Sequence, residues 1–155
     1  MLQLKFFELI FRVIPEIFIL SYGIITISQE KRIQKKPYVI LAIILSILVD
    51  LVRKLPISFG LHIVINIILT ISVMSILGLP LIKNIYGTFF VYFIFSFSEF
   101  INMVILNALN ISIYVNDIND IRKVLLGIPS LFIMIIFVFI LKFILKKRRN
   151  MNVYH

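Results

Sequence analysis

Residues 50–62 read DLVRKLPISFGLH, and they separate two long apolar runs of the chain. This stretch brings an acid, two bases, a proline, a glycine and a histidine into a sequence that otherwise consists mostly of Ile, Leu, Phe and Val. Pro56 cannot continue a helix because it lacks an amide hydrogen, and Gly60 relaxes the backbone before the next run. We therefore predict a tight hairpin between two helices at this point.

The composition of the whole chain indicates a membrane protein. Its 155 residues are 61% hydrophobic and only 15% charged, with a mean hydropathy of +1.11, whereas soluble domains are about half apolar. We therefore predict an all-α integral membrane bundle, a single polytopic domain over residues 1–155 with about five transmembrane helices, because about 20 apolar residues cross a bilayer. The expected spans are 13–27, 38–54, 61–79, 85–109 and 124–145.

The N-terminal segment admits two interpretations. Four charged residues there follow spacings of three and four, so they share one face of an apolar helix. They are Lys5, Glu8, Arg12 and Glu16. Residues 2–12 either begin the first span, with their charged side chains snorkelling to the membrane surface, or lie as a short helix in the membrane interface. Pro15 predicts a kink or a new start in both cases.

The basic residues indicate how the chain is oriented. The densest basic clusters are Lys31, Arg32, Lys35 and Lys36 after the first span, and Lys146, Lys147, Arg148 and Arg149 after the last. Because loops rich in Lys and Arg stay in the cytoplasm, we predict the N-terminus outside and the C-terminus inside, in a multi-pass protein of the bacterial cytoplasmic membrane. The net charge of +9 is then an orientation signal. We expect the lipid bilayer as a partner, and no nucleic acid.

Polar residues inside the spans recur at helical spacing. Within each span these polar residues lie on one helix face, and nearly all of them fall in the predicted outer half of the membrane. They could therefore converge on one outward-facing pocket. The predicted ligand-binding residues are Glu16, Asp50, Arg53, His62, Asn66, Glu99 and Asn102. The alternative is that each polar group only bonds to a neighbouring helix, for about 0.6 kcal/mol on average.

Glu99 is the one acid well inside a predicted span, so it requires a cationic partner or must stay protonated. The candidate partners are Arg12, Arg53, Lys54 and His62. His62 has no second ligand nearby in the sequence, there is no cysteine, and no catalytic motif occurs. We therefore expect no enzyme, no catalytic residues, no metal and no cofactor. Glycine is also scarce, so we expect no close helix contacts of the small-xxx-small kind.

Two stretches carry a family resemblance. IPEIFILSYGIITI (residues 14–27) and VRKLPISFGLHIVI (residues 52–65) resemble the N-terminal membrane region of sensor histidine kinases from low-GC Gram-positive bacteria, the kind with a GHKL-type ATPase domain. The resemblance covers roughly residues 14–130 and includes Glu99 and the Gly-Ile-Pro that ends at Pro129. In that family the membrane region senses a signal and passes it to a cytoplasmic kinase.

The chain ends at KKRRNMNVYH, without the dimerising helix, phosphoacceptor histidine or ATPase of that family, so kinase activity does not carry over. The resemblance implies a stand-alone sensor-like domain that takes a small or peptide signal and relays it to a cytoplasmic partner, with a kinase or ATPase on another chain. The basic tail would contact anionic lipid or that partner. A membrane subunit of a transport system and a structural protein without ligand are the alternatives, and a homo-oligomer stays open.

Overall fold

The computed structural model describes residues 9–30, 33–56, 59–109 and 120–151. These residues are almost entirely helical and contain no strand, which confirms the predicted all-α class. The elements are η1 (Leu9–Val13), α2 (Ile14–Ser28), α3 (Lys35–Arg53), α4 (Phe59–Ile76), α5 (Leu81–Ala108) and α6 (Asp120–Met151). The π-helical turn η1 leads directly into α2, and Pro15 lies in the first turn of α2, where its missing amide costs no hydrogen bond.

Three helical segments are long and apolar enough to cross a membrane: Leu9–Ser28, Leu81–Ala108 and Leu125–Arg148. The apolar part of α4, Gly60–Ile76, is shorter, and α3 carries charged residues at both ends. Large apolar side chains cover the outside of these helices; Phe93 and Phe143, for example, are 68% and 69% exposed. Such a surface suits lipid as the surrounding solvent.

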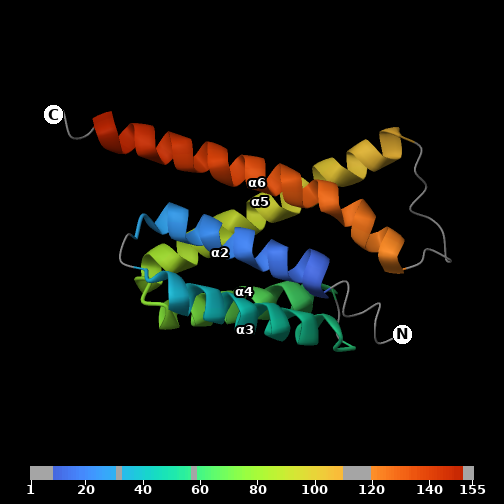
Figure 1. Ribbon diagram of the computed structural model, residues 1–155, viewed down its shortest axis with the longest axis horizontal. Coiled ribbons are helices and arrows are strands. Elements are labelled where there is room, and N and C mark those ends of the chain that lie inside the picture. The colour runs from blue at the N-terminus through green and yellow to red at the C-terminus, as the bar shows by residue number, and fades with distance from the viewer. Residues whose placement is uncertain (1–8, 31–32, 57–58, 110–119, 152–155) are drawn as a thin grey trace.

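Figure 1 shows α2 at the centre of the bundle, between the α3–α4 pair and the crossing helices α5 and α6. Helix α2 contacts α3, α5 and α6, and α4 packs against both α3 and α5. Successive helices run in opposite directions, so two ends can be defined (Figure 1). We call the end with η1 and the α3–α4 connection the hairpin end, and the end with the α4–α5 connection and the C-terminus the tail end.

The connection between α4 and α5 is shorter than predicted. The third span was expected to reach residue 79 and the fourth to start at 85, but α4 ends at Ile76 and α5 begins at Leu81. Gly78 adopts a φ of +92°, a left-handed conformation that stops the helix, and Pro80 occupies the N-cap of α5. Residues 81–84, which lay between the predicted spans, are therefore helical.

Helix α6 is longer than the predicted span 124–145, because it runs from Asp120 to Met151. Pro129 lies inside it, where it removes the amide that would bond to the Leu125 carbonyl. The basic residues of the tail extend the helix at its other end: Lys146, Lys147 and Arg148 are exposed, and the side chain of Arg149 lies outside the described residues.

The core forms around α2. Ile17, Leu20 and Ile24 are at most 1% exposed, and they pack with apolar residues from every other long helix. Two single glycines allow close helix contacts. A Cβ atom added at Gly23 would lie 3.1 Å from Val91 Cγ2, and one at Gly87 would lie 3.3 Å from Ile24 Cγ2. Neither glycine belongs to a repeated small-residue motif, which is why composition did not reveal them.

Candidate functional site

A cavity of about 540 Å³ lies between η1, α2, α3, α4 and α5 toward the hairpin end. We call it the polar cavity. Its charged lining residues are Arg12, Glu16, Arg53 and Glu99, and its uncharged polar ones are His62, Asn66, Tyr92 and Ser96. Its apolar walls are Ile17, Leu20, Val49, Ile63 and Phe95. The volume is within the range of sites for small molecules.

The strongest contact in the cavity joins α2 to α3. Arg53 Nη2 donates to Glu16 Oε1 at 2.5 Å. The Glu16 side chain is only 4% exposed, whereas that of Arg53 is 31% exposed. Glu16 stands in the first turn of α2, where the helix dipole favours a negative charge. The ion pair of Glu16 with Arg53 therefore joins the polar face of α2 to the C-terminal end of α3.

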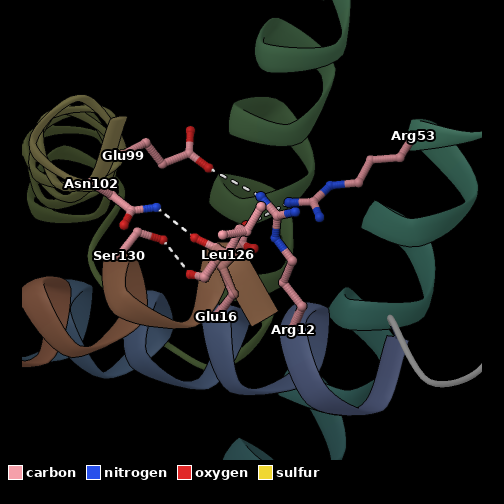
Figure 2. Close-up of polar contacts among 8 residues, drawn as sticks. Arg12, Glu16, Arg53, Glu99, Asn102, Leu126 and Ser130 are labelled. Atoms are coloured by element: carbon pink, nitrogen blue, oxygen red, sulfur yellow. Dashed lines mark hydrogen bonds and ion pairs between the residues drawn. The ribbon is translucent and has the colours of Figure 1, made fainter. Parts of the chain in front are cut away.

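A looser ion pair closes the other side of the cavity. Arg12 Nη2 lies 3.6 Å from Glu99 Oε1, which is beyond a hydrogen bond, and both side chains are partly exposed. Figure 2 shows Arg12 and Arg53 reaching from separate helices toward the same space. Of the four candidate partners of Glu99, the ion pair in the described residues is with Arg12. Gly127 of α6 leaves room for this arginine, because a Cβ there would lie 3.1 Å from Arg12 Cζ.

The polar residues of α4 recur every four positions, at His62, Asn66 and Thr70, and this stripe faces α5. Thr70 Oγ1 lies 2.9 Å from Tyr92 Oη. Tyr92 lies two turns before Glu99 on α5. Closer to the hairpin end, His62 Nδ1 and Asn66 Oδ1 are buried and have no hydrogen-bond partner among the described residues. Most buried polar atoms in proteins are bonded to protein or to water, so these two atoms in the cavity wall leave hydrogen bonds for a water molecule or a ligand.

The structure brings five of the seven predicted site residues to the polar cavity: Glu16, Arg53, His62, Asn66 and Glu99. Asp50 instead pairs with Lys54 one turn along α3, with the Lys54 side chain 46% exposed. Asn102 is 7% exposed and donates from Nδ2 to the Leu126 carbonyl at 2.8 Å, as Figure 2 shows. This bond ties α5 to α6 in the turn before Pro129.

Sequence reasoning did not assign three polar lining residues to the site: Arg12, Tyr92 and Ser96. Arg12 was placed on the same helix face as Glu16 and named as a candidate partner of Glu99, but it was not predicted to bind the ligand. Tyr92 and Ser96 precede Glu99 by seven and three residues, which places all three on one face of α5. Extending the stripe of Glu99 by two turns toward the start of α5 would have found Ser96 and Tyr92.

Asn102→Leu should lower the free energy of unfolding by about 1–2 kcal/mol, because the Leu126 carbonyl would lose its side-chain donor in the turn before Pro129. The measurement is chemical unfolding of the protein in detergent micelles, followed by circular dichroism. Asn107→Leu is the matched control, since Asn107 lies on the same helix with an exposed side chain. Equal losses for both variants would show that the α5–α6 bond contributes nothing.

The polar cavity is suited to binding by its composition. Two arginines and two glutamates balance one another in formal charge, unsatisfied polar atoms lie in the wall, and five apolar side chains shape the rest. No protein-family model, curated protein or solved structure matches the chain. The resemblance to the membrane regions of sensor kinases therefore stays a prediction from the sequence.

Proposed function

We propose that this chain is a membrane-embedded binding module whose polar cavity receives a small or peptide signal. One observation carries the proposal: His62 Nδ1 and Asn66 Oδ1 are buried, have no hydrogen-bond partner in the described part of the chain, and lie in the wall of a cavity that also holds two ion pairs. Charges of both signs favour a ligand that also carries both, such as a zwitterion or a short peptide. The apolar wall of Ile17, Ile63 and Phe95 would receive its side chain.

The proposed topology has five spans, with the hairpin end outside and the tail end inside. Helices α3 and α4 contain 19 and 18 residues, roughly 27–28 Å at 1.5 Å per residue, which is close to the 30 Å hydrocarbon core. The tail end holds the basic start of α3 and the basic end of α6, and the positive-inside rule favours the cytoplasm for that end. The polar cavity then opens toward the outside.

Reporter fusions test this orientation. A cytoplasmic reporter fused after residue 150 should be active, and a reporter that requires export should be active after residue 110, because these positions flank α6 on opposite sides of the membrane. In-frame fusions in growing cells provide the measurement. The reverse pattern at both positions would place the polar cavity at the cytoplasmic face and contradict an external signal.

Helix α6 is the element that would relay occupancy to the inside. At the hairpin end, Arg12 of the cavity packs beside Gly127, and Asn102 holds the Leu126 carbonyl. The same helix continues to the exposed Lys146, Lys147 and Arg148. A ligand that moves Arg12 therefore changes a direct contact with the helix that ends in the basic tail, where a cytoplasmic kinase or ATPase on another chain is the proposed partner.

Ser96→Trp should abolish ligand-dependent stabilisation of the protein, because an indole at this lining position fills the polar cavity. The measurement is the thermal unfolding temperature in micelles with a panel of free amino acids and short peptides. A ligand at 100 times its Kd stabilises the native state by about 2.7 kcal/mol, so an effective probe should raise the Tm of the native sequence by several degrees.

Ser72→Trp provides the control for this experiment, since Ser72 is an exposed serine of α4 outside the polar cavity. This variant should keep the full Tm increase. If the effective probe stabilises both tryptophan variants equally, it binds elsewhere, and the polar cavity is not the site.

A further inference from the structure

A second hollow region follows the α2–α6 interface toward the tail end. Its apolar part, which we call the apolar groove, has a volume of about 270 Å³ and is lined by Phe18, Ile19, Ile135 and Phe139, among others. The adjoining part, the basic hollow, has a volume of about 280 Å³ and includes Lys142 and Lys146. Tyr22 lines both parts, so they adjoin at this residue, and we call the two parts together the strip.

The strip follows one face of α6. Ile135, Phe139, Lys142 and Lys146 are spaced by four, three and four residues, which keeps their side chains aligned along the helix. The strip therefore changes from mostly apolar to basic within about two turns. The change occurs near the end of the segment Leu125–Arg148, which is long and apolar enough to cross a membrane. An apolar surface with a cationic end at that depth is complementary to the acyl chain and the anionic headgroup of one phospholipid molecule.

The charges in the basic hollow leave Lys142 available for an anion. Its Nζ donates to Tyr22 Oη at 2.6 Å and lies 5.3 Å from the centroid of that ring, but it has no ion pair with any carboxylate among the described residues. The acid in the hollow, Glu30, lies 4.0 Å from Lys83 of α5. Tyr22 thus holds the ammonium group at the junction between the apolar groove and the basic hollow.

We propose that this strip binds one anionic phospholipid. An acyl chain would lie in the apolar groove, and the phosphate would accept hydrogen bonds from Lys142 and Lys146. The apolar groove favours a lipid over free phosphate, because a free ion would make no use of that surface. A zwitterionic lipid would bring a cationic group beside the two lysines. The site is independent of the polar cavity, which lies toward the other end of the bundle.

Native mass spectrometry of the protein in micelles tests the proposal, with phosphatidylglycerol and phosphatidylcholine of identical acyl chains as probes. We expect one tightly held phosphatidylglycerol and markedly weaker binding of phosphatidylcholine. The double variant Lys142→Gln, Lys146→Gln should bind phosphatidylglycerol roughly fivefold more weakly for each lysine removed, which is the effect of one basic group near an anionic surface. The control is Lys147→Gln, Arg148→Gln, which removes two exposed charges outside the hollow and should retain the lipid.

Ile135→Trp tests the apolar groove separately from the charges and should also weaken phosphatidylglycerol binding. Equal losses in the two double variants would overturn the proposal, because attraction would then come from the general charge of the tail. Equal retention of the two lipids would overturn it as well. If sodium phosphate displaces phosphatidylglycerol and Ile135→Trp binds it normally, the region is a phosphate site and not a lipid site.

Discussion

Arg53→Met should destabilise the protein by about 3–5 kcal/mol, the usual result of removing one partner from a buried ion pair. The reason is the asymmetry of the pair: Glu16 is almost fully buried, and Arg53 is its hydrogen-bond donor at 2.5 Å. Methionine keeps an unbranched apolar stem but leaves the buried Glu16 carboxylate without its hydrogen-bond donor. Chemical unfolding in micelles, followed by circular dichroism, would measure the change.

Two further variants separate the ion pair from general effects at the end of α3. Lys54→Met removes the neighbouring base, whose pair with Asp50 is more exposed, and should cost less than about 1 kcal/mol. The double variant Glu16→Leu, Arg53→Met should recover most of the stability, because an apolar pair can replace a buried ion pair. A double variant as unstable as Arg53→Met alone would contradict this account of the site.

Gly87→Leu should destabilise the protein by about 2–3 kcal/mol through overpacking of the α2–α5 interface. Even a single Cβ atom at this position would lie 3.3 Å from Ile24 Cγ2 and 3.4 Å from the Ile24 carbonyl oxygen. The backbone atom cannot turn away as a side chain could, so the two helices would have to separate. Unfolding in micelles, compared with the native sequence, would measure the loss.

Gly60→Leu is the matched control, because a Cβ atom there meets nothing within 4 Å. Gly60 also lies in a helix and is exposed, so its replacement should change stability by less than about 0.5 kcal/mol. Similar losses at Gly87 and Gly60 would mean that glycine itself, and not the close contact between α2 and α5, determines the effect.

The sequence predicted the helical class and the approximate place of each helix because apolar runs and prolines act locally. It also predicted much of the polar cavity, since a spacing of four residues assigns Glu16, His62 and Asn66 to helix faces without knowledge of the partners. Which faces would meet was an inference from topology. The membrane orientation and the ligand stay predictions.

The features that sequence reasoning missed depend on contacts between distant residues. Asn102 shares a helix face with Glu99, but it bonds to the Leu126 carbonyl across the α5–α6 interface, and no local pattern reveals that acceptor. Residues 81–84 lay between two predicted spans, yet Asn84 is buried and donates to the Ile71 carbonyl at 2.7 Å. Gly87 gave no signal because a close contact depends on the neighbouring helix as much as on the glycine.

The bond between Glu16 and Arg53 also has a consequence for how the chain is made. The two residues are 37 positions apart, so the first helix is synthesised before its hydrogen-bonding arginine exists. A lone carboxylate is costly in lipid, and η1–α2 and α3 should therefore leave the insertion machinery together, as a paired unit. The remaining helices of the bundle would then insert against α2 and α3, which are already paired.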